Sequence, residues 1–344
     1  MAPEATGVAF RGALALLIAS LCAGVGNAVT GLTAHDYISS GSLLPAVDIG
    51  LANTLGGLAL VSIFYFVLIF GFKNRGTLSG SQETKTTLTH FRSGYSLMAG
   101  FFKGTNTVLF VVSTTYIVAT QSLVFESTYL IWSLILGVSF LARRMTLVSS
   151  LLKTLLMLAG VILVSGETSF NLTIGYSTLG ATFGILAGVS FALYLFSWSF
   201  VTKSLENTSS SLLATGLLLS ISAITIVVFS EILTLVFLGV PWVPFASLKP
   251  ADSFLQILNG GLNIGIVYLL VASGMSAMRN VREGADFVAS ILLSFTIPFT
   301  LLTELVIGKF VPSDLQLLGV LVFMVGFILI GKGLSPTYSS GSQS

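Results

Sequence analysis

Residues 142–165 read ARRMTLVSSLLKTLLMLAGVILVS, and residues 308–331, which lie 166 positions later, read GKFVPSDLQLLGVLVFMVGFILIG. Six positions of this ungapped alignment are identical: Leu151, Leu152, Leu155, Gly160, Ile162 and Leu163 match Leu317, Leu318, Leu321, Gly326, Ile328 and Leu329. Arg143 falls on Lys309. Self-similarity at a fixed spacing is typical of a chain that contains one structural unit twice. Two unrelated Leu-rich helices with similar composition are the alternative.

The composition around these segments indicates an integral membrane protein. The chain of 344 residues is 54% hydrophobic and 8% charged, which leaves too little polar surface to cover a soluble domain of this size. Apolar runs of roughly 20 residues, the length that crosses a bilayer core, recur along the chain. We expect an all-α fold with ten spans at about 12–34, 47–72, 94–116, 121–141, 147–165, 176–201, 210–239, 252–275, 287–307 and 314–331.

Positive charge predicts the orientation of these spans. Ten crossings put both termini on one side, and Lys and Arg collect in short cytoplasmic loops. With both termini cytoplasmic, only Lys249 and Lys309 of the loop cations fall outside; the inner ones are Arg11, Lys73, Arg75, Lys85, Arg92, Arg143, Arg144, Lys203, Arg279, Arg282 and Lys332. We therefore expect a multi-pass protein with both termini in the cytoplasm.

This orientation predicts that the two similar segments cross the membrane in opposite directions, because they lie an odd number of spans apart. Inverted repeats about an axis in the membrane plane occur in many secondary transporters. We expect a first five-helix repeat at 1–170, a second, inverted one at 171–335, and a disordered tail at 336–344.

The chain resembles the ten-helix, EamA-like branch of the drug/metabolite transporter superfamily over nearly its whole length. The resemblance is carried by the short link at Ala119 and Thr120, the turn at 140–146, the following helix with Gly160, and, in the second half, by the segment 307–310, Gly319, Gly326 and Pro298. The acidic residue usual in the family's turn is missing from both halves, and Leu130 stands where a first-half proline would be expected. The resemblance implies transport and names no substrate.

Two ionisable residues lie deep within predicted spans. Counted along their helices at about 1.5 Å per residue, Lys103 and Glu126 fall at similar depths, roughly 6 Å apart along the membrane normal. An intramembrane charge is by default a functional hypothesis. One interpretation is a salt bridge that joins two helices; the other places both residues on a central cavity, where Lys103 attracts a carboxylate or phosphate and Glu126 an amine or a proton. An amino acid carries both complementary charges.

Further polar and aromatic residues are candidates for the same cavity: Asn106, Tyr129 and Trp132 in the first half, and Asn259, Asn263 and Tyr268 in the second. Helical spacing places Asn259 and Asn263 on one face. Hydrogen bonding between helices is the alternative role for all six. Asp48, near the start of the second span, is predicted to be a helix cap.

Glycine and proline predict packing and hinges. Gly180, Gly184 and Gly188 repeat at a spacing that permits close helix approach. Pro298 removes a backbone hydrogen bond and is expected to kink the ninth span. The residue at the corresponding place in the first half, Leu130, offers no equivalent, so the two halves are not expected to move identically.

The function expected from these features is secondary transport of a small polar organic solute, such as an amino acid or a related metabolite, by alternating access. Coupling would be to protons, with Glu126 as the proton site, or by exchange. No cofactor, metal or nucleic acid is expected, and no phosphate-binding motif for ATP is present in the sequence. Carriers of sugars, nucleotide sugars or phosphorylated metabolites remain alternatives, as do an intramembrane enzyme and a channel.

Overall fold

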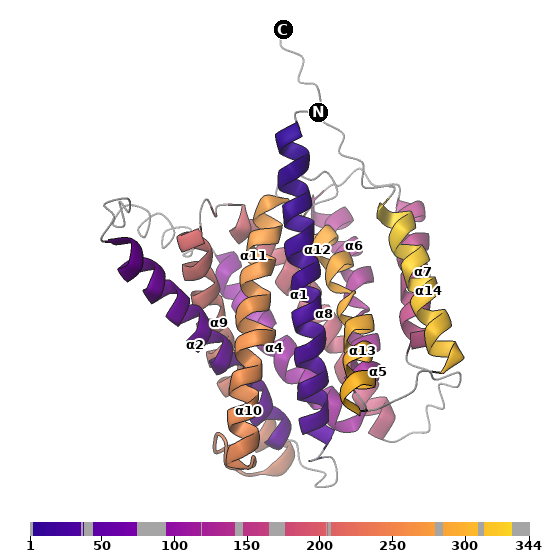
Figure 1. Ribbon diagram of the computed structural model, residues 1–344. Coiled ribbons are helices and arrows are strands. Elements are labelled where there is room, and N and C mark those ends of the chain that lie inside the picture. Colours follow the sequence, from indigo (N-terminus) through magenta and orange to yellow (C-terminus); the bar gives the residue numbers. More distant parts are fainter. Residues whose placement is uncertain are drawn as a thin grey trace.

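The computed structural model describes residues 3–35, 37, 44–73, 94–117, 119–141, 147–164, 176–203, 205, 208–278, 285–308 and 313–331, and in this part of the chain every regular element is a helix. The helices stand side by side in one bundle (Figure 1). In chain order they are α1 (Pro3–His35), α2 (Leu44–Lys73), α4 (Gly94–Tyr116), α5 (Ala119–Glu126), α6 (Tyr129–Leu141), α7 (Leu147–Val164), α8 (Tyr176–Thr202), α9 (Thr208–Leu238), α10 (Pro250–Gly260), the π-helix η2 (Gly261–Ile266), α11 (Val267–Ala277), α12 (Ala285–Leu293), α13 (Thr296–Gly308) and α14 (Asp314–Gly331).

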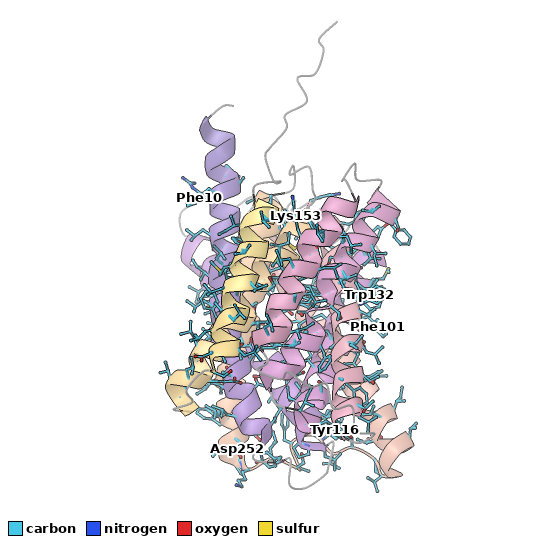
Figure 2. The ribbon with its side chains drawn as sticks, turned by 90° about the vertical axis from the view of Figure 1, so that its right-hand side faces the viewer. Phe10, Phe101, Tyr116, Trp132, Lys153 and Asp252 are labelled. Atoms are coloured by element: carbon cyan, nitrogen blue, oxygen red, sulfur yellow. The ribbon has the colours of Figure 1, made fainter. Side chains whose placement is uncertain are left out.

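The predicted multi-pass membrane character is confirmed. Within the described residues, seven helical segments are long and apolar enough to cross a membrane, and two shorter apolar helices occur in α7 and α14. The helix α4 has sufficient length but is not among the seven, because Lys103 and its polar neighbours lower its hydropathy. Large apolar side chains, such as Phe66, Val236 and Val306, are more than half exposed on the outside of the bundle. Figure 2 shows such side chains projecting from the bundle along its length, as a lipid-facing surface requires.

Two of the predicted spans are each built from two helices. The fourth is interrupted at Ser127 and Thr128, between α5 and α6, and the ninth at Ser294 and Phe295, between α12 and α13. At both sites serine hydroxyls donate to carbonyl groups of the preceding turn: Ser127 Oγ to Val124 O and Ser294 Oγ to Ile291 O. Side chains thereby bond to backbone groups close to each interruption, where the regular helical hydrogen bonds end.

The kink expected at Pro298 coincides with the interruption of the ninth span, which directly precedes the proline, and its role as a hinge stays a prediction. Pro298 lies in the first turn of α13, after the interruption, where a helix has no intrahelical partner for its N–H groups. Pro298 has no N–H group to donate to the carbonyl of Ser294, four residues earlier. This carbonyl instead accepts from Ile297 N at 3.2 Å. The fourth span is also interrupted, although no proline stands near its break.

The eighth predicted span is one long helix with a π-helical segment, η2, in its middle. Glycines bring its backbone against α2. A Cβ atom at Gly260 would collide with the backbone of Asn53, and one at Gly56 would collide with the carbonyl of Ile257. The α2 and α10 backbones are therefore in direct contact.

Glycines mediate close contacts elsewhere in the bundle as well. The three glycines of α8 face α4 and the α5–α6 interruption: Gly180 lies against Ile117, Gly184 against Phe125, and Gly188 against the Glu126 carbonyl. At the edge of the bundle α7 pairs with α14 (Figure 1).

Asp48 anchors a loop and is not a helix cap, contrary to the prediction. It lies on the second turn of α2, fully buried, and accepts from Trp242 Nε1 at 2.9 Å, Phe245 N at 2.8 Å and Ser247 N at 3.1 Å, and from the Ser247 hydroxyl. Phe245 has a φ of 64°, a left-handed backbone conformation that is unfavourable for a bulky residue. The carboxylate thus holds the α9–α10 connection against α2.

Several predicted features lie outside the described residues. They are the tail at 336–344, the turn at 142–146, and most of the loop cations, including Arg143 and Lys309.

Candidate functional site

An internal cavity of about 110 Å³ lies where seven of the ten predicted spans meet. Its walls come from α1, α2, α4, α5, α6, α8, η2, α11, α12 and α13. Both helix interruptions face it: Glu126 and Tyr129 flank the first, and Leu293 and Thr296 flank the second. Discontinuous helices near the middle of the membrane are a recurrent way to build a solute site, because they expose polar groups there.

Lys103 is 5% exposed and extends along its own helix. Its ammonium donates to the Thr107 hydroxyl and, at 3.4 Å, to Asn106 Oδ1. The same ammonium lies 5.0 Å from the centroid of the Tyr268 ring, which is within the range of a cation–π interaction. Lys103 is therefore held by two neutral hydrogen-bond partners and one aromatic face.

Glu126 is the last residue of α5 and is 9% exposed. Its Oε1 accepts from Asn106 Nδ2 at 2.7 Å, and the same Nδ2 also donates to the Ala187 carbonyl of α8 at 3.1 Å. Lys103 and Glu126 are thus connected through the Asn106 amide and not through a direct salt bridge. Of the two interpretations of this pair, the geometry supports the one in which both residues face a cavity.

Aromatic rings form the wall beside the two charges. The rings of Tyr129 and Phe191 meet edge to face at 4.9 Å, Phe191 lies 5.6 Å from Tyr194, and Tyr194 lies 5.4 Å from Tyr268. The Tyr194 hydroxyl is fully buried and has no hydrogen-bond partner. A buried hydroxyl without a partner is costly to stability.

The opposite wall is formed by amides and a hydroxyl on α1, α2 and η2. Asn263 Nδ2 donates to Asn27 Oδ1 at 3.2 Å, and Asn53 Nδ2 donates to Thr30 Oγ1 at 3.2 Å. These four side chains line the cavity. Behind them Asn259 Nδ2 donates to the Gly26 carbonyl and to Thr30 Oγ1, both at 3.0 Å, so the Asn259 amide is engaged in packing α10 against α1.

The structure brings six of the eight predicted cavity residues to the cavity: Lys103, Asn106, Glu126, Tyr129, Asn263 and Tyr268. Asn259 lies behind the wall, and Trp132 is 38% exposed and does not line the cavity. Sequence reasoning missed the residues from α1, α2 and α8, namely Asn27, Thr30, Asn53, Phe191 and Tyr194. An isolated asparagine within an apolar span was the signal for Asn27 and Asn53.

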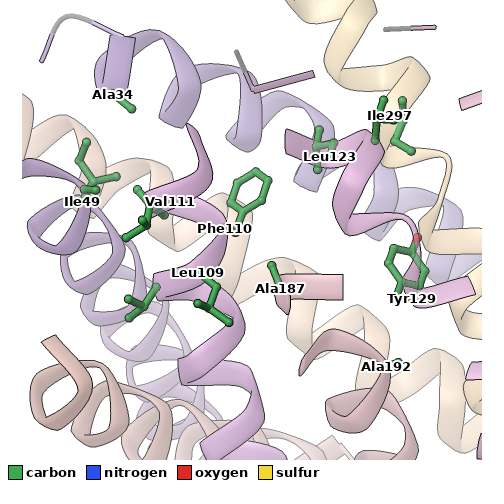
Figure 3. Packing of buried hydrophobic residues seen from close by; sticks show 14 of the residues in the cluster. Ala34, Ile49, Leu109, Phe110, Val111, Leu123, Tyr129, Ala187, Ala192 and Ile297 are labelled. Carbon is green, nitrogen blue, oxygen red and sulfur yellow. The ribbon is translucent and has the colours of Figure 1, made fainter. Parts of the chain in front are cut away.

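An apolar cluster bounds the cavity on one side. Phe110 lies two turns beyond Lys103 along α4, and in Figure 3 its ring points toward Leu123 of α5, beside Ile297 of α13. Phe110 lies between Lys103 and Tyr116 along α4. Among the described residues no group of three or more His, Cys, Asp or Glu side chains could hold a metal ion.

Comparison with known proteins supports the fold alone. No protein-family model matches the sequence, and no curated protein matches it. A solved crystal structure has a similar fold, with a TM-score of 0.57 and 14% sequence identity over 96% of this chain and 97% of the other. At this level of identity the similarity concerns the path of the chain and carries no functional assignment.

Proposed function

We propose that this protein is a secondary transporter that carries a small polar organic solute, such as an amino acid or a related metabolite, through the central cavity by alternating access. The observation that carries the proposal is that Lys103 and Glu126, both almost completely buried, face a common cavity between two interrupted helices. Intramembrane charges are expensive and are characteristic of solute and proton pathways.

Reciprocal helix contacts support an inverted-repeat architecture. A Cβ atom at Gly160 would collide with the backbone of Phe323, and one at Gly326 would lie 2.9 Å from the backbone nitrogen of Met157. Phe323 is the repeat partner of Met157, and Gly326 that of Gly160, at the spacing of 166 residues. Contacts in which each residue meets the other's equivalent are a property of twofold symmetry.

The remaining helices support the same symmetry. The two interruptions, beginning at Ser127 and Ser294, lie 167 residues apart. The helix α1 packs on the eighth and ninth predicted spans, and α8 packs correspondingly on the third and fourth. The first helix of each half thus packs on the other half, as expected when the repeats 1–170 and 171–335 are related by a twofold axis. This packing favours a ten-span arrangement like that of the drug/metabolite transporter superfamily.

Both termini are proposed to be cytoplasmic. The start of α1 and the end of α14 lie at the same end of the bundle (Figure 1), as an even number of crossings requires. Single cysteines introduced at 8 and at 249, probed with a membrane-impermeant maleimide in a Cys22→Ser background, test this orientation. We expect the reagent to label position 249 and not position 8 from outside the cell. Labelling of position 8 alone would show the opposite orientation of the termini.

Solute exchange in proteoliposomes tests the function. Purified protein is reconstituted with one unlabelled solute inside, and uptake of the labelled solute is followed for neutral amino acids, amines, sugars, nucleotide sugars and phosphorylated metabolites. We expect saturable exchange for one class, with loss in Lys103→Met and retention in Lys153→Met, which removes a lysine that does not line the cavity. Absence of exchange for every class, or unsaturable conduction of ions, would refute transport by alternating access.

A further inference from the structure

The Asn106 amide has a defined polarity between the two charges of the cavity. Its Oδ1 accepts from the Lys103 ammonium, and its Nδ2 donates to the Glu126 carboxylate. One small group therefore presents an acceptor to the cation and a donor to the anion. A solute that replaces this amide must offer the same two functions in the same order.

The spacing of the charges limits the size of such a solute. The contacts of 3.4 and 2.7 Å, joined by the O to N separation of about 2.2 Å within an amide, place Lys103 Nζ and Glu126 Oε1 at most about 8 Å apart. A carboxylate oxygen and an ammonium nitrogen on one carbon are about 3 Å apart, and charge-assisted hydrogen bonds add about 2.8 Å at each end. An α-amino acid head group therefore spans a gap of the same length.

The charge of the cavity selects among solute classes. Of the described side chains that line it, Lys103 is the one cation and Glu126 the one carboxylate. A phosphate dianion would meet one cation only and would lie close to a carboxylate. A sugar would leave both buried charges with neutral partners, which is unfavourable. A zwitterion matches both charges at once.

We infer that the cavity binds the head group of an α-amino acid, with its carboxylate at Lys103 and its ammonium at Glu126, and that Asn106 is the group displaced. This inference rests on the proposed transport function. Asn106 keeps a partner when displaced, because Nδ2 also donates to the Ala187 carbonyl at 3.1 Å. Lys103 keeps the Thr107 hydroxyl and the Tyr268 ring. The cavity volume of about 110 Å³ suits a small side chain on the bound solute.

A series of matched ligands tests the head group. Glycine, L-alanine and L-serine carry both charges on one carbon; L-lactate lacks the ammonium, L-alaninamide lacks the carboxylate, and γ-aminobutyrate separates the two. Binding is measured by the rise in melting temperature of the purified protein, and transport by exchange in proteoliposomes. We expect a neutral α-amino acid to raise the melting temperature and to be exchanged. The three comparison compounds should bind at least about tenfold more weakly than this amino acid.

Variants assign each charge to its partner. Lys103→Met is expected to bind L-alanine and L-alaninamide equally weakly, because the carboxylate then has no cation to meet, whereas Lys153→Met retains the preference for L-alanine. Glu126→Gln is expected to bind L-alanine and L-lactate equally weakly, because the ammonium of L-alanine then has no carboxylate to meet. If a variant does not fold, the ligand series on the wild-type protein decides the question alone.

The outcomes separate this inference from the transport function. Equal binding and exchange of L-lactate, L-alaninamide or γ-aminobutyrate would overturn the assigned head group and leave transport standing. Exchange of sugars or phosphorylated compounds without any α-amino acid would have the same consequence. If no solute of any class is exchanged, the transport proposal fails and the inference fails with it.

Discussion

The indole Nε1 of Trp242 donates to Asp48 Oδ1 at 2.9 Å and so joins the α9–α10 connection to α2, 194 residues earlier in the chain. Asp48 is fully buried and accepts three further hydrogen bonds from the same connection. Two more contacts hold this end of the bundle: the Tyr37 hydroxyl donates to Asp252, and Lys249 N donates to the Tyr37 hydroxyl at 3.0 Å.

Replacement of Asp48 by alanine should destabilise the protein by about 3 kcal/mol, because it leaves one buried donor and three partly buried donors without an acceptor. Unfolding in mixed micelles measures the effect. Trp242→Phe, which removes one of the donors, should lower stability less. Asp314→Ala, at an exposed acid in the first turn of α14, serves as the control, with an expected change below about 1 kcal/mol. Equal effects of Asp48→Ala and Asp314→Ala would contradict the anchoring role.

Valine at Gly160 and valine at Gly326 should have similar effects, because the two glycines make equivalent contacts between α7 and α14. A side chain at either position would meet the backbone of the opposite helix, so each variant should lose about 2 kcal/mol of stability. Gly216→Ala is the control, since its nearest neighbour, a Val61 methyl group, lies 3.7 Å from the new Cβ. A large loss in one glycine variant together with no loss in the other would argue against the symmetric contact.

Glutamine at Glu126 should weaken exchange of unlabelled for labelled solute, because the solute ammonium loses its carboxylate partner, and should abolish the accumulation that a pH gradient drives. The side-chain amide of the Glu126→Gln variant cannot gain or lose a proton, yet its carbonyl oxygen can still accept from Asn106. Uptake is compared with and without a pH gradient across the liposome membrane. Gradient-driven accumulation that survives in Glu126→Gln would remove Glu126 as the coupling site.

Alanine at Asn106 should raise the solute concentration required for half-maximal exchange by about tenfold. Without the amide between them, Lys103 and Glu126 can approach each other, and the resulting ion pair competes with the solute. Exchange is measured over a range of solute concentrations. Thr182→Ala, which removes an exposed hydroxyl from α8, is the control. An unchanged half-saturation concentration in Asn106→Ala would show that the amide does not keep the charges apart.

Alanine at Pro298 should change stability by less than about 1 kcal/mol and leave the exchange rate nearly unchanged. The proline nitrogen lies in the first turn of α13, where an N–H group would have no intrahelical partner, and the interruption precedes it. Thermal unfolding and exchange kinetics check both quantities. A severalfold slower exchange in this variant would show that Pro298 acts as a hinge.

Counting residues along apolar spans was sufficient to bring Lys103 and Glu126 close together, because both lie on regular helix at a depth that the chain length defines. The interruption at Ser127 was not foreseeable in this way. Hydropathy averages over a whole span and does not register a two-residue turn between two helices, and no proline marks the site. The π-helical segment η2 has the composition of an ordinary glycine-rich span, so it was missed for the same reason.

Long-range partners limited the interpretation of single polar residues. Asp48 has the position of a helix cap in the sequence, and its actual partners lie on a connection almost 200 residues away. Asn259 and Trp132 have the residue types expected of a cavity wall. Their side chains point elsewhere because the helix faces that surround the cavity depend on how all the spans pack.

The polarity of α4 has a consequence for the synthesis of this protein in the membrane. The helix that supplies Lys103, Asn106 and Thr107 to the cavity is less apolar than the seven segments that are long and apolar enough to cross a membrane. The helices that pack most closely on it, α8 and α9, follow later in the chain. When α4 leaves the ribosome only α1 and α2 of its packing partners are present, and the two helices that cover most of it have not been made. We therefore expect stable insertion of α4 to wait for these later helices, so that truncation before α8 would leave it outside the bilayer or exposed to degradation.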